Sequence, residues 1–280
     1  MAKYHRVLVA VDGSDTSLHA LQESFKLTGS WVTVVTVAPF YEGDLRLVGV
    51  ANPQALMLEP CNTAAERAQE MAAEAGAVII TVCAVGTPHE SIVEVAAAGS
   101  RDLIVMGSKG QSFIDRALLG GVTRRVIGYT EKDVLVVPLQ GQVGWDKILL
   151  ATDASKSGEA ATARALDLAE AYGGELQVMA VMEFLGQVYG EAPVITQWRD
   201  VLQKHVDKIV AQAQSRNISS SGQVLDGNPY KAITTLAQNE KINLIVMGSH
   251  GRSGLKRLLM GRVTERVIGH APCPVLVVNG

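Results

Sequence analysis

The chain carries the same pattern of strands and loops twice, and this duplication limits the fold more than any other feature. Three segments of the first half, Arg6–Asp12, Asp102–Ser108 and Val134–Val137, match Lys147–Asp153, Asn243–Ser249 and Val275–Val278 in the second half. Every matched pair is 141 residues apart, whereas a solenoid repeat has roughly 20–50 residues. We predict two similar domains, residues 1–140 and 145–280, joined near Leu139–Gly144, a short segment with two glycines.

Each half alternates short apolar runs with longer helical patterns. In the second half we expect strands at Lys147–Thr152, Glu175–Met182, Ile218–Leu225, Leu244–Gly248 and Val275–Val278. We expect helices at Ser157–Ala171, Gln197–Ser215, Pro229–Asn239 and Val263–Gly269. Strands that are apolar throughout are typical of a parallel sheet covered by helices on both faces. The sequence therefore predicts an α/β fold in each half.

Composition excludes several classes of protein. The chain is 48% hydrophobic with a net charge of −3, which argues against disorder and against binding to nucleic acid or membranes. No apolar run reaches about 18 residues, and the N-terminus leads into a strand pattern rather than a signal peptide. The three cysteines, Cys61, Cys83 and Cys273, are odd in number, and the six histidines lack the spacing of a metal site. We expect a reduced, cytoplasmic protein without metal or structural disulfide, in which Cys83 and Cys273 fill apolar spaces.

A loop with three glycines follows the fourth strand of each half. The glycines are Gly107, Gly110 and Gly120 in the first loop and Gly248, Gly251 and Gly261 in the second. They let main-chain amides approach an anion, and the last one precedes a helical pattern whose N-terminal amides favour phosphate. Their spacing is neither that of a Walker loop nor that of a dinucleotide-binding loop. We predict an anion site at the carboxyl end of the sheet, beside the aspartate that ends the first strand.

Both loops are basic, although the chain as a whole is acidic. The first contains Lys109, Arg116, Arg124 and Arg125 against Asp115. The second contains Arg252, Lys256, Arg257, Arg262 and Arg266 against Glu265. Such clustering favours an anionic ligand, and the alternative is a glycine-rich turn with solvated basic side chains.

The aspartate after the first strand, the Val-Met-Gly-Ser loop and the closing segment His270–Val278 resemble the universal stress protein family. The resemblance covers the whole chain as a tandem pair. It implies five-stranded parallel sheets of the adenine nucleotide-binding type, with strand order 3-2-1-4-5, and ATP or AMP as ligand, with or without Mg²⁺. It implies a site in the second half at Ala151, Thr152, Asp153, Val181, Met247, Gly248, Ser249, His250, Gly251, Gly261, Arg262, Val263 and Thr264. The matching positions in the first half are Asp12, Val37, Gly107, Ser108, Gly110, Gly120, Gly121, Val122 and Thr123. We predict that this first site is the weaker one, because the second half keeps the closing segment of the family, and we expect no catalytic residue.

The chain departs from this family at one position in each loop. Members that bind ATP carry Ser or Thr after the third glycine, where this chain has Gly121 and Arg262. One lost hydrogen bond to a charged group is worth about 1.5–3 kcal/mol, which weakens binding without abolishing it. We therefore predict a nucleotide-dependent regulatory or interaction module of a stress response. The alternatives are a slow ATP hydrolase or autophosphorylating protein, and an interaction module without nucleotide in which Arg262 closes the second pocket.

Some local roles stay open at the level of the sequence. Asp153 either accepts hydrogen bonds from ribose or caps a helix, and Ser14 and Ser155 are predicted helix caps. His250 either positions phosphate or lies on the surface of its loop. The segment Phe40–Glu59 is either a flap over the first pocket or a long loop.

The last strand of each half is a candidate contact between the halves. Val134–Pro138 and Val275–Asn279 are short, rich in valine and without charge, which is typical of sheet edges that proteins cover. We predict that the two strands pair with each other within the chain, and a homodimer stays open.

Overall fold

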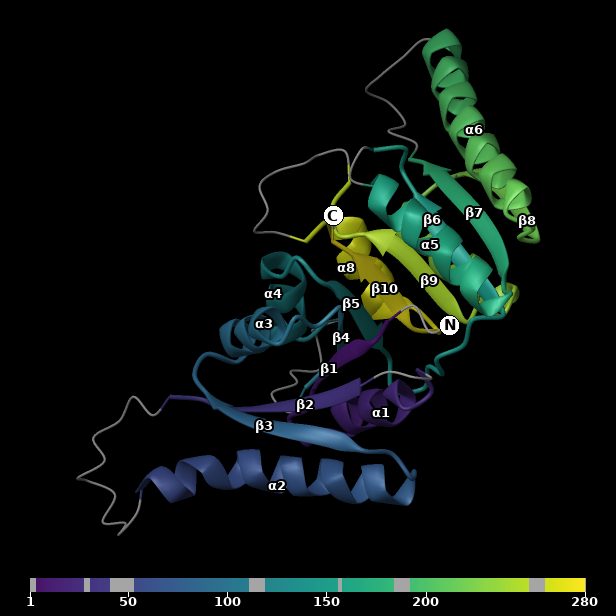
Figure 1. The fold of residues 1–280 in the computed structure, drawn as a ribbon. Helices are drawn as coiled ribbons and strands as arrows, with labels where there is room; N and C mark the ends of the chain where they lie inside the picture. Colours follow the sequence, from purple (N-terminus) through teal and green to yellow (C-terminus); the bar gives the residue numbers. More distant parts are fainter. Residues whose placement is uncertain are drawn as a thin grey trace. The chain divides into compact units, whose positions relative to one another are not determined.

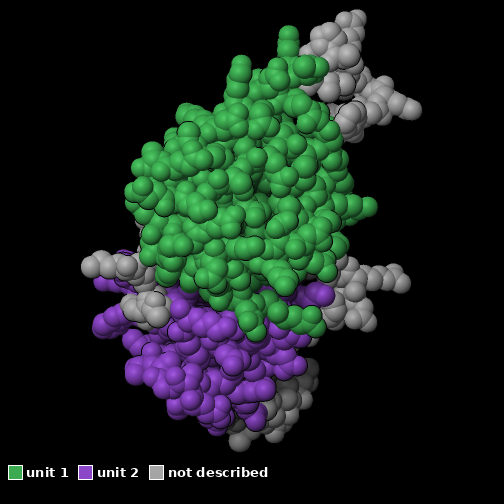
Figure 2. Space-filling model, turned by 90° about the vertical axis from the view of Figure 1, so that its right-hand side faces the viewer, with its two compact units in different colours: residues 1, 140–280 green, residues 2–139 purple. Residues whose placement is uncertain are grey.

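The computed structural model describes residues 4–27, 31–40, 53–110, 119–155, 158–183, 192–251 and 260–279 of the chain. The chain divides into two compact units, residues 2–139 and residues 140–280 together with residue 1 (Figure 2). The first unit holds the earlier half of the duplication and the second unit the later half.

The first unit is a parallel sheet whose strands alternate with helices (Figure 1). Its elements are β1 (Arg6–Ala10), α1 (Asp15–Ser24), β2 (Trp31–Ala38), α2 (Pro53–Glu74), β3 (Ile79–Val85), α3 (Pro88–Ala98), β4 (Leu103–Gly107), α4 (Gly121–Tyr129) and β5 (Asp133–Val137). The strand order is β3-β2-β1-β4-β5, and each neighbouring pair is parallel. Leu8 of the central strand β1 and Ile104 of its neighbour β4 are fully buried, because helices cover both faces there.

The second unit repeats this arrangement. Its elements are β6 (Lys147–Thr152), α5 (Gly158–Tyr172), β7 (Glu175–Met182), α6 (Ala192–Ser215), β8 (Ser220–Asp226), α7 (Pro229–Asn239), β9 (Leu244–Gly248), α8 (Arg262–His270) and β10 (Val275–Val278). The order β8-β7-β6-β9-β10 is again parallel throughout. The predicted α/β class with parallel sheets is therefore confirmed.

Some predicted boundaries were wrong. Helix α6 begins at Ala192 rather than Gln197, and β8 begins at Ser220 rather than Ile218. The cause at β8 is Asn217, whose φ of 60° ends α6 in a left-handed turn. The loop expected over Phe40–Glu59 is helical from Pro53, and residues 41–52 lie outside the described part of the chain. In that described part, no helix is both long and apolar enough to cross a membrane.

The first unit contains a disulfide, which corrects the expectation of a chain without one. Cys61 of α2 is bonded to Cys83 of the edge strand β3, across 22 residues of sequence. Cys83 pairs in register with Thr36 of β2, and the hydroxyl of Thr36 lies 2.8 Å from the sulfur of Cys61. Cys83 is exposed rather than an apolar filler, while Cys61 is buried. The packing of α2 over β2 and β3, which the sequence pattern did not predict, brings the two sulfurs together.

Cys273 differs from this pair, since it is a buried free thiol as predicted. Burial raises the pKa of the Cys273 thiol to about 12. The side chain is therefore uncharged at neutral pH and packs as a small apolar group.

An aromatic contact joins the last two helices of each unit. In the first unit the rings of His89 and Tyr129 are 5.4 Å apart, from α3 to α4. In the second unit Tyr230 and His270 are 5.1 Å apart, from α7 to α8. The two positions correspond across the duplication, but histidine and tyrosine have exchanged places. The contact is thus retained in both units with its two residue types reversed.

Candidate functional site

The candidate site of each unit lies where the strand order reverses. In the second unit β6 has β7 on one side and β9 on the other, and in the first unit β1 lies between β2 and β4. All strands are parallel, so the segment after β6 and the loop after β9 leave the sheet at the same edge. Ligands of open α/β sheets bind at this kind of position.

In the second unit the aspartate after β6 lies against the glycine loop. A Cβ added to Gly251 would be 2.8 Å from Oδ2 of Asp153. The other carboxylate oxygen, Oδ1, accepts a hydrogen bond of 3.0 Å from the amide of Ser155. The structure thus brings together the aspartate and the glycine loop, the two features that the sequence placed at this edge. Any residue larger than glycine at position 251 would displace the carboxylate.

The first unit repeats this contact. A Cβ on Gly110 would be 2.6 Å from Oδ2 of Asp12. Oδ1 of Asp12 accepts from the amide of Ser14 at 3.1 Å and from its hydroxyl at 2.6 Å. The Ser14 hydroxyl also accepts from the amide of Ser17 and caps α1, as predicted. The aspartate therefore orders its own turn with one oxygen and faces the glycine loop with the other.

The third glycine of each loop stands directly before a helix. The amide of Gly261 donates to the carbonyl of Ser249 at 2.9 Å, and that of Gly120 donates to Ser108 at 2.9 Å. These bonds fold the loop back on its own beginning. The first amides of α8 and α4 have no acceptor within their helices, so they are placed to receive an anion.

Two threonines fix the loop rather than offering hydroxyls to a ligand. Thr264 donates to the carbonyl of Gly248 at 3.0 Å, and Thr123 donates to the carbonyl of Gly107 at 3.1 Å. Both threonines are buried. Their contribution to an anion site would come from their main-chain amides.

The two positions that depart from the family pattern are both exposed. Arg262 is the first residue of α8, and its side chain does not bury itself in the site. Gly121 is the first residue of α4, and a Cβ there would meet nothing within 4 Å. A serine would therefore fit at position 121, so the departure removes a hydroxyl without closing the space.

Other predicted positions surround this edge at different depths. By extension of the register, Val181 stands beside Asp153 and Val37 beside Asp12; both valines are half-buried. Ala151 and Val122 are half-buried, Val263 is exposed, and Met247, Thr152, Ser108 and Ser249 are buried. His250 is half-buried, with Nδ1 2.9 Å from the hydroxyl of Ser249.

Sequence analysis missed two features beside Asp153. His205 reaches from α6 to the end of β6, where its Nε2 is 3.2 Å from Oγ1 of Thr152. His205 lies within an amphipathic helical pattern, and nothing in that pattern indicated a contact with Thr152. Ala154 has a φ of 59°, and the matching Gly13 has a φ of 81°. Alanine in this left-handed conformation is strained, which is frequent beside functional sites.

The structure describes only some of the residues of the two predicted basic clusters. Arg262, Arg124 and Arg125 are exposed near the helix starts, and Lys109 is half-buried. The guanidinium of Arg266 lies 5.2 Å from the ring centre of Tyr230, so it stacks on α7 instead of facing the loop. Glu265 is half-buried in α8, and five members of the two clusters lie outside the described residues: Asp115, Arg116, Arg252, Lys256 and Arg257. Within the described ranges, no three side chains of His, Cys, Asp or Glu are grouped to hold a metal ion.

Comparison with known proteins identifies the family. The sequence pattern of the universal stress protein family matches residues 3–138 and 144–279. A universal stress protein of Methanocaldococcus jannaschii is 33% identical over 144 residues, covering 50% of this chain and 85% of that protein. One of Mycolicibacterium smegmatis is 29% identical over 188 residues, covering 65% of this chain and 63% of that protein.

A solved structure resembles the chain over its full length. The crystal structure of a universal stress protein from Archaeoglobus fulgidus has a TM-score of 0.70 and 21% sequence identity, and covers 98% of this chain and 96% of its own. At this identity the likeness concerns the fold. The two matches of the family pattern show that the chain belongs to the universal stress protein family as a tandem member.

Proposed function

We propose that the chain is a nucleotide-dependent regulatory or interaction module that binds ATP or AMP, mainly in its second unit. The Asp153 carboxylate lies against Gly251, and Gly261, the residue before α8, lies against Ser249 and His250 of the same loop. These two contacts are the observation that supports this proposal most. A carboxylate suits ribose hydroxyls, which donate hydrogen bonds, and helix amides suit phosphate oxygens, which accept them. The two ends of a nucleotide therefore have complementary partners at one sheet edge.

Different residues would bind different parts of the nucleotide. Asp153 would accept from ribose, and Val181 would contact the apolar faces of adenine and ribose. The main chain from Gly248 to Gly251 and from Gly261 to Thr264 would surround the phosphates. Arg262, exposed at the start of α8, would pair with a phosphate from the side. Mg²⁺ would enter with a triphosphate, through phosphate oxygens.

The direct test is mass spectrometry of small molecules released when the purified chain is denatured, followed by calorimetric titration with ATP and AMP. We expect Gly261→Val to remove most of the binding and Gly120→Val to remove less, because the second loop is the more basic. Loss of binding confined to Gly120→Val would assign the main site to the first unit. Turnover of radiolabelled ATP would indicate that the chain is a slow hydrolase. Absence of nucleotide binding would indicate an interaction module that works without nucleotide.

Asp153→Asn should weaken ATP binding at least tenfold and change the melting temperature little. The amide keeps the size of the carboxylate but loses the charge that strengthens hydrogen bonds from ribose, about 1.5–3 kcal/mol. Calorimetry and thermal unfolding of the same preparation measure the two effects separately. Unchanged affinity with a lower melting temperature would show that Asp153 acts only as a cap on its turn.

We further propose that the last strands of the two units, β5 and β10, pair within the chain. The double variant Val136→Lys and Val277→Lys should expose the amides of both strands to hydrogen exchange together, since each strand would lose its partner. Sedimentation tests whether a homodimer also forms. Last-strand amides that exchange freely in the unaltered chain would contradict the pairing. We also propose a cytoplasmic location. Thiols are kept reduced there, so the Cys61–Cys83 bond would form only under oxidising conditions.

A further inference from the structure

The Cys61–Cys83 bond joins helix α2 to the edge strand β3 of the first unit. Figure 1 shows α2 lying along β3. Within the described residues β3 pairs with β2 alone, so no further strand covers its outer side. Cys83 is exposed on this strand, whereas Cys61 is buried. A peroxide or a small thiol can therefore reach the pair from the side of Cys83.

The buried face of α2 consists of small side chains. Apart from Cys61, the described buried residues of this helix are all alanines: Ala64, Ala68 and Ala72. The matching face of α6 in the second unit consists of larger aliphatic residues and one alanine: Leu202, Val206, Ile209 and Ala213. Alanine buries less apolar area than leucine, valine or isoleucine. Packing on the sheet therefore stabilises α2 less than it stabilises α6.

The second unit makes the same contact between helix and edge strand without sulfur. Across the 141-residue spacing, Cys61 corresponds to Leu202 and Cys83 corresponds to Val224. Leu202 is buried, and Val224 lies on the face of β8 that α6 covers, as Gly222 does. The fold of a unit therefore does not require a covalent bond at this place. In the first unit the bond is an addition, so it can form and break while the fold is kept.

The turns of α2 before Cys61 pack loosely on the sheet. Among the described side chains of residues 55–60, none is buried. Pro60 has no amide hydrogen, so the helix lacks a main-chain hydrogen bond directly before Cys61. The later turns have the three buried alanines and a hydrogen bond of 3.1 Å from Nε2 of Gln69 to Oγ1 of Thr81 on β3. The disulfide therefore stands at the boundary between a loosely packed part of α2 and a better packed one.

We propose that Cys61 and Cys83 form a redox site, which a hydroperoxide oxidises and a dithiol reductant reduces, and that their bond docks the first turns of α2 on the sheet. In the oxidised chain α2 is fixed to β3 at Cys61. In the reduced chain the turns before Cys61 open, while the alanine face keeps the later turns in place. Local opening of this kind does not require unfolding of the whole unit. The proposal does not depend on nucleotide binding.

Oxidation by hydrogen peroxide begins at the exposed cysteine. The Cys83 thiolate attacks one peroxide oxygen, the O–O bond breaks, and hydroxide leaves, so that Cys83 becomes a sulfenic acid. The Cys61 thiol then attacks this sulfur, the S–O bond breaks, and the sulfenic oxygen leaves as water with the proton of Cys61. The proton that Cys83 released joins the hydroxide. Two thiols and one peroxide thus give one disulfide and two waters, and two electrons pass from sulfur to oxygen.

Reduction follows the same path from the solvent side. A thiolate of the reductant attacks the sulfur of Cys83, and Cys61 leaves as a thiolate that takes up a proton. The second thiol of the reductant then breaks the mixed disulfide and releases Cys83. The reductant ends as a disulfide, and the chain regains two thiols.

Hydrogen exchange of the native full chain, after peroxide and after dithiothreitol, tests the docking of α2. The amides of residues 55–61 should exchange at least tenfold faster in the reduced chain, and those of residues 64–74 should change less. The matching turns of α6, residues 196–202, are a control within the same molecule. They should not respond, because Leu202 packs there without a bond.

Cysteine variants separate the bond from other effects of the two reagents. The double variant Cys61→Ser and Cys83→Ser should exchange like the reduced chain under both conditions. Cys273→Ser should respond like the unaltered chain, since Cys273 is not part of the bond. Equal exchange of residues 55–61 in the two states, or equal acceleration in every helix of the first unit, would overturn the docking by the bond.

Trapping of sulfenic acid with dimedone tests the order of the two sulfurs. Cys61→Ser removes the second thiol, so peroxide should leave Cys83 as a sulfenic acid that dimedone labels. Cys83→Ser should be labelled at least tenfold less, because Cys61 is buried. Equal labelling of the two variants would overturn the assigned order. A native chain whose bond resists dithiothreitol, or whose thiols stay unbonded after peroxide, would overturn the redox site itself.

Discussion

Gly251→Ala should lower the affinity of the second unit for ATP at least tenfold and leave its melting temperature almost unchanged. The added Cβ would lie 2.8 Å from Oδ2 of Asp153, so the carboxylate must move out of its place at the sheet edge. A side-chain carboxylate moves at small cost, and the φ of Gly251 is not left-handed, so the fold tolerates the change. The loss of a charge-assisted hydrogen bond, about 1.5–3 kcal/mol, corresponds to tenfold or more in affinity.

Other glycines of the same motif supply controls with different expected results. Gly110→Ala should act on Asp12 in the first unit as Gly251→Ala acts on Asp153 in the second. Gly107→Ala should lower stability instead, because its Cβ would be 2.9 Å from the main chain of Thr16, which cannot move alone. Gly121→Ala meets nothing within 4 Å and should be neutral. Calorimetry and thermal unfolding distinguish these cases; equal affinities for Gly251→Ala and the unaltered chain would refute the proposed role of the contact.

Reduction of the Cys61–Cys83 bond should lower the free energy of unfolding of the first unit by about 3 kcal/mol. The bond closes a loop across 22 residues, and its reduction returns that chain entropy to the unfolded state. Cys83 is exposed, so a thiol can reach its sulfur by exchange. Urea unfolding with and without dithiothreitol measures the difference, and hydrogen exchange of α2 assigns it to the first unit.

Two variants distinguish the bond from other effects of the reductant. The double variant Cys61→Ser and Cys83→Ser should unfold at the same urea concentration with and without dithiothreitol. Cys273→Ser should keep the full response, because Cys273 is not part of the bond. Thiol titration of the denatured chain should find one thiol before reduction and three after it. Three thiols before reduction would show that the bond does not form.

The sequence was most informative for strands that have a neighbouring strand on each side. The second-half strands at Lys147–Thr152, Glu175–Met182 and Leu244–Gly248 agree with the structure residue for residue. Each of these strands has another strand on either side and helices over its faces. Its sequence is therefore mostly apolar and has well-defined ends. The meeting of Asp153 with Gly251 followed from topology, since segments at the carboxyl ends of neighbouring parallel strands must lie close together.

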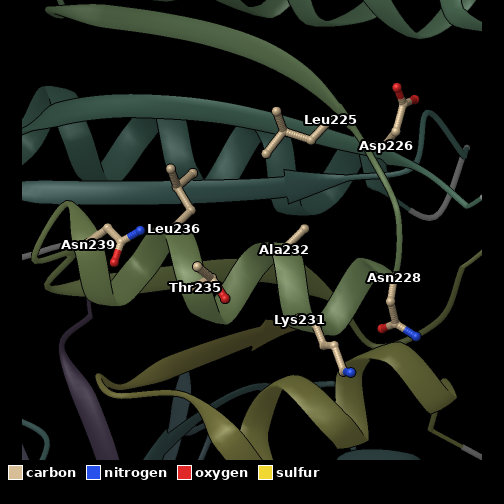
Figure 3. A pocket seen from close by; sticks show the side chains of 8 residues that line it. All are labelled: Leu225, Asp226, Asn228, Lys231, Ala232, Thr235, Leu236 and Asn239. Atoms are coloured by element: carbon tan, nitrogen blue, oxygen red, sulfur yellow. The ribbon is translucent and has the colours of Figure 1, made fainter.

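Other features depend on packing between elements that are distant in sequence. The start of α2 was missed because its first turns, which include Pro60, carry no regular apolar stripe. Nothing in the sequence pattern placed Cys61 of this helix opposite Cys83 of β3. The groove of about 350 Å³ between β8 and α7 (Figure 3) gave no signal in the sequence, because a groove is space that packing leaves unfilled.

The exchanged ring pairs, His89 with Tyr129 and Tyr230 with His270, restrict how segments can be swapped between the halves. A recombinant whose crossover separates the third helix of a half from the fourth creates a mismatched pair. One chimaera would place two histidines in contact, and their positive charges would repel each other when acid protonates both rings. The reciprocal chimaera would join two tyrosines, which carry no charge in acid. Of the two hybrids made from the same fragments, only one would be labile in acid.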